Sequence, residues 1–381
     1  MCEIGGRRQA AGRGEVMADF CPIRNVDHLE LYVGNAKQAA VFYGSAFGFA
    51  TTAYRGLETK RRDAASYVVQ QGDVRLVLTS ALDPAHPIAK HVCEHGDGVG
   101  VIALTVPDAA AAFHETTRRG ATPAIQPTEE RDEQGVVRYS AIHAYGDTLI
   151  KFVDRDDYAG VFGPGFQPRT SSAPRGNPVG LTAIDHVVGN VELGGMDRWV
   201  QFFADTMGFT QLVHFDDKAI STEYSALMSK VMQDGTGRVK FPINEPATGK
   251  RKSQVQEYLD YYHGPGVQHI ALATDDIVAT VSELRARGVG FLRVPRTYYD
   301  DLEQRVGRIQ EPVERLAELG IMADRDDEGY LLQIFSDTVE DRPTLFFEII
   351  ERHGARGFGE GNFKSLFEAI EREQARRGNL V

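Results

Sequence analysis

The sequence predicts an α+β protein made of two similar halves, because pairs of segments repeat along the chain. VDHLELYVGNAKQAAVFYGSAFGF, from Val26, matches IDHVVGNVELGGMDRWVQFFADTMGF, from Ile184; each reads as a strand, a Gly-Asn pair and an amphipathic helix ending in Gly-Phe. GDGVGVIALTVPD, from Gly96, matches GPGVQHIALATDD, from Gly264, and a helix closed by glycine follows each. Each half therefore contains a strand, a helix and several further strands.

The two predicted domains are separated by DDYAGVFGPGFQPRTSSAPRGNPVG, which has four prolines, five glycines and little periodicity. Such a segment cannot bury one face and is typical of a linker. We expect a disordered tail over residues 1–22, an N-terminal domain over 23–160, a linker over 161–180 and a C-terminal domain over 181–381.

Composition limits the classes of function. The 381 residues include 42 Lys and Arg against 54 Asp and Glu, a formal charge of −12, which disfavours binding to nucleic acid or to an anionic membrane. No apolar run approaches the roughly 20 residues of a membrane span, and the first residues lack the apolar region of a secretory signal. Three cysteines without a CxxC pair fit a reducing cytosol, so we expect a cytoplasmic protein.

A C-terminal helix over residues 362–377 is the last predicted element. An apolar stripe at spacing i, i+3, i+4, i+7 marks it: Phe363, Leu366, Phe367 and Ile370. Asn362 is placed to cap its start, and Gly378 to close its end. Because a glycine-rich loop precedes this helix, we interpret it as a mobile lid whose inner face brings Phe363 to the substrate; a purely structural packing helix is the alternative.

Three metal-binding residue types occur inside apolar strands of the second half: His186, His269 and Glu348. A buried carboxylate without a partner would cost several kcal/mol, so Glu348 requires a cation or a hydrogen-bond donor. Two imidazoles and one carboxylate form the ligand set of non-haem Fe(II) oxygenases. In the first half the aligned residues are His28, Val101 and Lys151, so only one ligand type remains there. A lone strand histidine is usually a core residue, and His28 keeps that interpretation.

These residues resemble the 4-hydroxyphenylpyruvate dioxygenase family of the vicinal-oxygen-chelate superfamily, over nearly all of residues 26–378. The specific motifs are IDHVVGNVELG, EYSALMSKV, FPINEPA, KSQVQEYL, GVQHIAL, GYLLQIFS, FFEIIERHG and GFGEGNFKSLFEAIE. The resemblance implies βαβββ modules paired into two open-barrel domains, with the C-terminal helix over the second barrel. It also implies one Fe(II) per chain, bound by His186, His269 and Glu348, and a non-catalytic first barrel.

By the same resemblance, further positions belong to the site. The implied catalytic positions are Gln268, Gln333, Asn244, Ser229 and Gln254, and the implied substrate-binding positions are Phe335, Phe358, Phe363 and Pro242. Strand alternation independently places Gln333 and Phe335 on one face. Strand alternation also places Gln268 on the face opposite its neighbour His269, unless a bulge intervenes. On sequence alone, Ser229 and Gln254 are expected to face solvent.

The resemblance implies a reaction of an aromatic α-keto acid with O2, in which 4-hydroxyphenylpyruvate gives homogentisate and CO2 during tyrosine and phenylalanine catabolism. The expected partners are therefore these small molecules, without nucleic acid or membrane, and the expected assembly is a homodimer or homotetramer.

Three alternatives remain open at the level of sequence. 4-Hydroxymandelate synthase shares the substrate and iron ligands, but the family expectation is that it replaces the Pro and Asn that stand here as Pro242 and Asn244. An extradiol ring-cleaving dioxygenase uses a similar ligand set, and the motif GNFKSLFEAIE disfavours it. A non-catalytic binding protein of the same superfamily usually lacks a complete ligand set.

Overall fold

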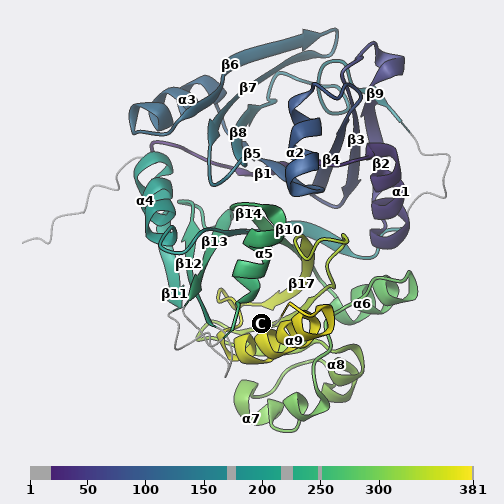
Figure 1. Cartoon of the computed structure of the whole chain (residues 1–381), viewed down its shortest axis with the longest axis vertical. Helices are drawn as coiled ribbons and strands as arrows, with labels where there is room; N and C mark the ends of the chain where they lie inside the picture. Colours follow the sequence, from purple (N-terminus) through teal and green to yellow (C-terminus); the bar gives the residue numbers. More distant parts are fainter. Residues whose placement is uncertain (1–18, 170–176, 216–225, 248–250, 380–381) are drawn as a thin grey trace, which may run out of the picture.

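The computed structural model describes residues 19–169, 177–215, 226–247 and 251–379. Figure 1 shows two bodies, one above the other, each built around a curved sheet with helices outside it. The upper body contains, in chain order, β1 (Asn25–Tyr32), α1 (Ala36–Phe47), β2 (Ala50–Arg55), the 3-10 turn η1 (Leu57–Thr59), β3 (Ala64–Gln71), β4 (Val74–Ala81), α2 (Pro87–His95), β5 (Gly98–Thr105), α3 (Ala109–Arg118), β6 (Pro123–Asp132), β7 (Gly135–His143), β8 (Leu149–Asp154) and β9 (Gln167–Pro168).

The lower body repeats this plan and then adds helices. It contains β10 (Leu181–Asn190), α4 (Met196–Met207), β11 (Thr210–Phe215), β12 (Ala226–Gln233), β13 (Lys240–Ala247), α5 (Gln254–Tyr262), β14 (Gly266–Thr274), α6 (Ile277–Ala286), η2 (Arg296–Tyr299), α7 (Leu302–Val306), α8 (Val313–Leu319), β15 (Met322–Arg325), β16 (Tyr330–Phe335), β17 (Phe346–His353), η3 (Glu360–Asn362) and α9 (Phe363–Arg377).

The strand orders confirm the predicted duplication. Among the described residues, the first sheet runs β6-β7-β8-β5-β1-β4-β3-β2-β9 and the second runs β15-β16-β17-β14-β10-β13-β12-β11. Apart from β9, each strand of one sheet has a counterpart at the same place in the other. The predicted linker supplies β9, which pairs with β2 at the sheet edge. We call the two units the first barrel and the second barrel.

The helix after the first strand of each barrel ends as its sequence indicates. Helix α1 ends at Gly48 with φ 76°, and α4 ends at Gly208 with φ 72°. A side chain disfavours this left-handed conformation, which glycine adopts without penalty. The next residues, Phe49 and Phe209, are buried, so each Gly-Phe pair both stops a helix and anchors the following strand in the core.

Aromatic packing and one amide join the barrels. The ring of Phe347 lies 4.9 Å from that of Phe47, centroid to centroid. The Gln71 side-chain oxygen accepts hydrogen bonds from the backbone N–H groups of Val179, Gly180 and Leu181, at 2.7, 3.0 and 3.1 Å. The start of β10, the first strand of the second barrel, is therefore held by the Gln71 side chain of the first barrel.

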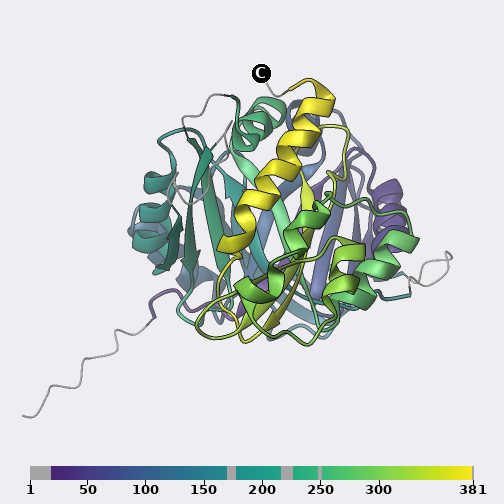
Figure 2. The same ribbon diagram turned by 90° about the horizontal axis from the view of Figure 1, so that it is seen from below.

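The additional helices lie outside the second barrel. The segment 293–328 folds into η2, α7 and α8, and Figure 2 shows α9 crossing the second barrel beside them. Helix α9 ends at Gly378, with φ 75°, as predicted. Asn362 was predicted as a side-chain cap, which is wrong: its Oδ1 accepts a 2.5 Å hydrogen bond from the Tyr298 hydroxyl instead. No helix in the described ranges combines the length and hydropathy that crossing a membrane requires.

Candidate metal centre

Three neighbouring strands of the second barrel carry the residues predicted to bind metal. His186 lies on β10, His269 on β14 and Glu348 on β17, and β14 runs between the other two. His186 pairs with Ala271, and Ala271 pairs with Glu348, so ligands from the outer strands meet across a small residue. Nε2 of His186 lies 3.1 Å, and Nε2 of His269 lies 3.5 Å, from Oε2 of Glu348. One potential ligand atom from each residue lies within 4.8 Å of the others.

Two register shifts aim the histidine rings. Ile184 pairs with Leu272 but His186 with Ala271, so Asp185 is an extra, bulged residue. Val188 pairs with His269 but Gly189 with Val267, so Gln268 is a second bulged residue. A bulge interrupts alternation and redirects a side chain. Here each bulged residue reaches the ring that follows it.

The bulged residues hold the Nδ1 atoms of both rings. Asp185 Oδ1 lies 2.7 Å from Nδ1 of His186, and Gln268 Oε1 lies 3.0 Å from Nδ1 of His269. Because both oxygens accept, each Nδ1 carries a proton, and Nε2 is the nitrogen that faces Glu348, where a proton or a metal ion can lie between the two atoms. Outer partners that fix the tautomer of a metal-binding histidine are a usual feature of metal sites.

Asp185 is held in turn by Arg352, two strands away on β17. Arg352 donates from Nε to Oδ2 at 2.7 Å and from Nη2 to Oδ1 at 2.8 Å. Two parallel hydrogen bonds of this kind fix orientation as well as position. Asp185 and Arg352 were not among the predicted site residues. The available clue was that Asp precedes His in both halves, and that Arg follows an acidic residue in both repeated strands near Asp154 and Glu351.

Burial and pairing act in opposite directions on these groups. Burial alone would raise the pKa of Glu348, but the adjacent His186 and His269 rings lower it below its ordinary value. Burial would likewise raise the pKa of Asp185, and Arg352 and His186 hold it well below the usual range. Burial lowers the pKa of His269. The site therefore favours an ionised carboxylate beside a neutral His269, a donor set suited to a divalent metal ion.

Gln333 and Phe335 lie on the same face as Glu348, as the alternation predicts. Phe335 pairs directly with Glu348 across β16 and β17, and its ring lies 6.0 Å from that of His269. Gln333 is 1% exposed, and both atoms of its amide are without a hydrogen-bond partner among the described residues. An unpaired buried amide is costly and suggests a partner that arrives with a ligand.

A row of polar side chains crosses β10, β13 and β12. Asn190 pairs with Asn244, and Asn244 pairs with Ser229. Asn190 lies four residues after His186, so alternation places the row on the same face of the sheet. Ser229 is buried, contrary to the solvent-facing position expected from the sequence alone. Pro242 lies two residues before Asn244, on the same face.

Gln254 is not part of the group formed by His186, His269 and Glu348. It begins α5 and lines a cavity of about 220 Å³ together with Gln268 and Phe346, and with Ile370 of α9. Gln268 therefore contacts His269 and also borders this cavity. The ring of Phe346 stacks on His269 at 4.8 Å, a contact that the sequence analysis did not predict.

Phe358 and Phe363 lie at the other side of the site. The Phe358 ring meets His186 edge to face at 5.0 Å. Phe363, the first residue of α9, packs in the same apolar cluster as Phe358, Val231 and Val255. The side chains of Leu366 and Phe367, two members of the predicted stripe, lie outside the described residues.

The first barrel keeps the supporting residues but only one of the three candidate ligand types, His28. His28 Nδ1 bonds Asp27, Arg155 pairs with Asp27 at 2.8 Å, and Phe162 lies 5.2 Å from the His28 ring. Strand pairing places Val101 where the second barrel has His269, and Lys151 where it has Glu348. Asp27, Arg155 and Phe162 thus surround His28 much as their counterparts surround His186, but the other two candidate ligand positions hold Val101 and Lys151.

Comparison with known proteins agrees with this architecture. The family described as "Glyoxalase/Bleomycin resistance protein/Dioxygenase superfamily" matches residues 25–158 and 183–334, one range per barrel. A 4-hydroxyphenylpyruvate dioxygenase from Dictyostelium discoideum is 49% identical over 363 residues, which cover 93% of this chain and 99% of that protein. The chain belongs to the 4-hydroxyphenylpyruvate dioxygenase family.

Other similar proteins support this assignment. The 4-hydroxyphenylpyruvate dioxygenase of Yarrowia lipolytica is 45% identical over 381 residues, covering 96% of each chain. Among solved structures, a variant of 4-hydroxymandelate synthase from Streptomyces coelicolor superposes with a TM-score of 0.82 at 33% identity, covering 93% of this chain and 99% of that one. As a 4-hydroxyphenylpyruvate dioxygenase family member, the chain is an enzyme with the predicted duplicated vicinal-oxygen-chelate fold.

Proposed function

We propose that the second barrel binds one Fe(II) through His186, His269 and Glu348 and converts 4-hydroxyphenylpyruvate and O2 to homogentisate and CO2 in tyrosine catabolism. The observation that carries this proposal is the convergence of two imidazoles and one carboxylate on a single point of the second barrel. The duplicate of that point in the first barrel has Val101 and Lys151 instead, so the set is specific to one barrel.

The donor chemistry fits the ion. Two neutral imidazoles and one carboxylate on one side leave the opposite side open for small ligands. When bound, Fe(II) supplies a chelation point for the α-keto acid and activation of O2. The chain's own residues do the rest: Asp185 and Gln268 keep the protons on Nδ1, so both Nε2 atoms remain available.

The surrounding side chains suit an aromatic α-keto acid. The unpaired Gln333 amide can donate to a substrate oxygen, and the polar row of Asn190, Asn244 and Ser229 offers further hydrogen bonds. Phe335 and Phe358 provide aromatic walls beside the histidine rings. These walls can hold the ring of the substrate and exclude water from the reacting atoms.

The second candidate is 4-hydroxymandelate synthase, favoured by the structural similarity to that enzyme. Intact Pro242 and Asn244 support the dioxygenase reaction instead, because the synthase is expected to replace both. We also propose that the protein is cytoplasmic. We further propose a homodimer or homotetramer, supported by the family resemblance and tested by light scattering of the purified protein.

The decisive experiment is anaerobic loading with Fe(II), followed by addition of 4-hydroxyphenylpyruvate and O2 and chromatography of one turnover mixture. We expect homogentisate as the main product, with at most a minor amount of 4-hydroxymandelate. A mandelate-dominated mixture would assign the chain to the synthase reaction, and a ring-opened product would assign it to extradiol cleavage. No product from iron-loaded protein would favour the binding-protein alternative.

A further inference from the structure

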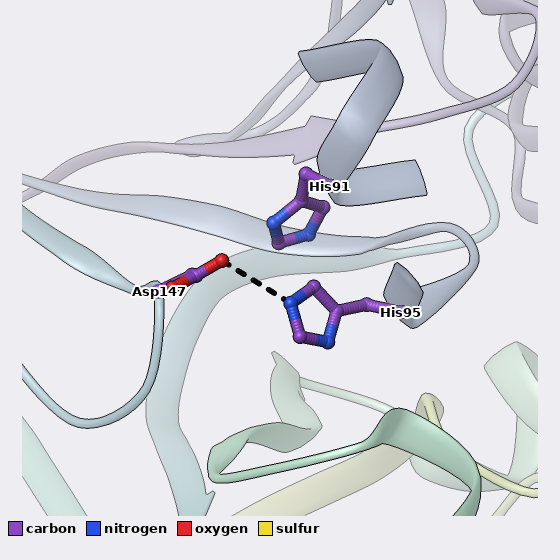
Figure 3. Close-up of side chains that lie close together, drawn as sticks. All are labelled: His91, His95 and Asp147. Carbon is purple, nitrogen blue, oxygen red and sulfur yellow. Dashed lines mark hydrogen bonds and ion pairs between the residues drawn. The ribbon is translucent and has the colours of Figure 1, made fainter. Parts of the chain in front are cut away.

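A second group of metal-binding residue types lies in the first barrel, far along the chain from the candidate iron site. His91 and His95 are four residues apart and share one face of α2, and Asp147 lies in the loop before β8. Figure 3 shows both rings and the carboxylate turned toward a common point. Nε2 of His95 lies 3.2 Å from Asp147 Oδ2, and one potential ligand atom from each residue lies within 4.8 Å of the others.

The protonation of His95 makes this arrangement informative. Its Nδ1 lies 2.5 Å from the backbone carbonyl oxygen of Tyr262, which can only accept, so Nδ1 carries a hydrogen. In the neutral ring Nε2 is then an acceptor that faces a carboxylate, another acceptor. That contact requires either a proton or a metal ion between the two atoms. A backbone carbonyl on the far nitrogen is a common outer partner of a metal-binding histidine.

His91 adds a neutral donor to the same place. It is 6% exposed, and burial, followed by the neighbouring His95 ring, lowers its pKa to about 4. Its ring centroid lies 4.6 Å from that of His95. Two imidazoles at i and i+4 on one helix face, with a carboxylate from another element, match the ligand preferences of Zn²⁺.

The duplication provides an internal comparison for this group. The matching segments HGDGV and HGPGV align His95 with His263 and His91 with Leu259, and the alignment of Lys151 with Glu348 places Asp147 opposite Thr344. The second barrel therefore retains one of the three residues. This is the reverse of the iron site, whose ligand set is complete only in the second barrel.

The group is accessible to an ion from solution. His91 and Asp147 line a cavity of about 1010 Å³ inside the first barrel, and the Asp147 side chain is 63% exposed. An ion can therefore reach His91 and Asp147 from the cavity without unfolding, and water from the cavity can occupy a fourth coordination position. Three protein ligands and one open position are a familiar zinc arrangement.

We propose that His91, His95 and Asp147 bind a divalent transition-metal ion of the Zn²⁺ type at the junction of the two barrels. The ion links α2 to the loop before β8 in the first barrel. His95 is in turn hydrogen-bonded to the backbone oxygen of Tyr262, at the end of α5 in the second barrel. Tyr262 also places its hydroxyl 3.4 Å from Nε2 of His91. The site does not depend on the identity of the metal or the substrate in the second barrel.

The test uses a full-length background variant in which His186, His269 and Glu348 are all replaced by alanine, so that zinc at the candidate iron site does not contribute. This protein is incubated with Zn²⁺, passed over a desalting column and analysed for bound zinc per chain. Asp147→Asn is then added, because its exposed side chain can be changed with little effect on folding. His143→Gln is the matched control, since this exposed histidine lines the same cavity without belonging to the group.

We expect the background protein to retain one zinc per chain and the His143→Gln control to retain the same amount. Asp147→Asn should weaken zinc binding by roughly tenfold or more, at least as much as removal of an outer partner of a metal ligand. Circular dichroism verifies that each variant is folded. Absence of stoichiometric zinc in the folded background protein, or equal binding after Asp147→Asn, would overturn the proposal and leave a His95–Asp147 ion pair as the explanation.

Discussion

Glu348 lies inside an apolar strand, yet its carboxylate is surrounded by groups that favour its charge. The nearest are His186 and His269, whose Nε2 atoms face it at 3.1 and 3.5 Å. These distances suit three atoms that share one ion about 2.1 Å away. The two imidazoles thus explain why Glu348 is ionised, although burial alone would keep its carboxyl group protonated.

The first prediction at this scale concerns the ligands. His186→Ala, His269→Ala and Glu348→Ala should each lose iron and activity while the fold is retained, because each removes one of three ligands from a preformed barrel. Iron per chain, measured by mass spectrometry, and circular dichroism check this. The control is His28→Ala, the aligned histidine of the first barrel, which should keep its iron. Stoichiometric iron in the triple alanine variant would show that the ligands lie elsewhere.

Sequence reasoning could predict the candidate ligands, which the structure brings together, but not the residues that orient them. His186, His269 and Glu348 are unusual residue types in apolar strands, and the duplicate showed which half could use them. Asp185 and Gln268 act through two bulges, and a bulge leaves no mark on a pattern of alternating residues. For the same reason Gln268 was expected on the opposite face from His269, although its oxygen lies 3.0 Å from that ring.

The second prediction concerns Asp185, a positioning residue. Asp185→Asn should weaken iron binding roughly 10- to 100-fold, as loss of an outer partner typically does. It should also cost roughly 3 kcal/mol of unfolding free energy at neutral pH, because Arg352 loses its partner in a mostly buried pair. The matched control is Asp27→Asn, which removes the equivalent Asp–Arg pair of the first barrel. It should cost similar stability without loss of iron.

The same pair predicts a pH dependence. The pKa of Asp185 lies below its unfolded value, so the folded state binds fewer protons and the pair stabilises it above the unfolded pKa of about 3.9. The stability difference between wild type and Asp185→Asn should therefore be constant from about pH 5 to 8 and shrink as pH falls below about 4. Urea unfolding across this range measures it. A difference that grew with acidity would contradict the assigned charge state.

The third prediction concerns Gly359, whose φ is +76°. A Cβ at this position would lie 2.3 Å from the Gln333 side-chain nitrogen. Gly359→Ala should displace that amide and raise KM for the keto acid while iron content stays unchanged. Gly378→Ala is a matched control, because Gly378 has φ +75° and open space around its Cβ position. Both substitutions carry the strain of about 1–2 kcal/mol of a left-handed residue, but only the first should change kinetics.

At the scale of elements, α9 packs across the second barrel beside the candidate metal centre (Figure 2). Its position after the last metal-binding strand was predictable, because a short glycine-rich loop follows Glu348. The cap at Asn362 was not predicted correctly, because Tyr298 comes from the inserted segment 293–328, whose packing no local pattern reveals. Residues Ile370, Glu373 and Arg377 of α9 line the cavity that Gln268 borders, so the helix covers one side of the site.

The fourth prediction is that α9 acts as a lid. Truncation after Gly361 should leave iron binding nearly intact, lower turnover sharply and uncouple O2 use from product formation, because water reaches the reacting atoms. Truncation also removes Arg377, which pairs with the buried Glu257 at 2.8 Å, so some stability is lost as well. Phe363→Ala isolates the lid effect and should lower turnover about tenfold or more.

The control for the lid is Arg377→Ala, which breaks the ion pair but retains Phe363. If α9 were only structural, both point variants would lower melting temperature and iron retention together and leave O2 coupling unchanged. Melting temperature, iron content and the ratio of O2 consumed to product formed, measured on the same samples, separate the two roles.

At the scale of the whole molecule, the duplication was predictable because the repeated motifs preserve their spacing. The way in which the barrels contact each other was not, since it depends on side chains far apart in the sequence. Arg342, from the connection between β16 and β17, donates to the backbone oxygen of Glu94 in the first barrel at 2.7 Å. Near it, burial and then the Asp97 carboxylate raise the pKa of Glu340 to about 9.

The fifth prediction follows from that carboxyl group. Because its folded pKa lies above the unfolded value, the folded state binds an extra proton between about pH 4.5 and 9, and its stability falls as pH rises through this window. Glu340→Gln should therefore melt about 2–4 °C higher than wild type at pH 8, the shift that about 1 kcal/mol produces in a large domain. The advantage should vanish near pH 5. Glu328→Gln, at an exposed glutamate, should show no such trend.

The first barrel holds its Asp27–Arg155 pair and its Asp27–His28 contact, although Val101 and Lys151 stand there at the positions that match His269 and Glu348. The matching pair in the second barrel therefore needs no ion to form, and the polypeptide can complete its folding before iron arrives. Iron then binds to a site that is already formed. In protein made under iron starvation, uptake of Fe(II) should follow the concentration of free ion in simple second-order kinetics. A slow, concentration-independent phase would instead show that the metal site forms only as the ion binds.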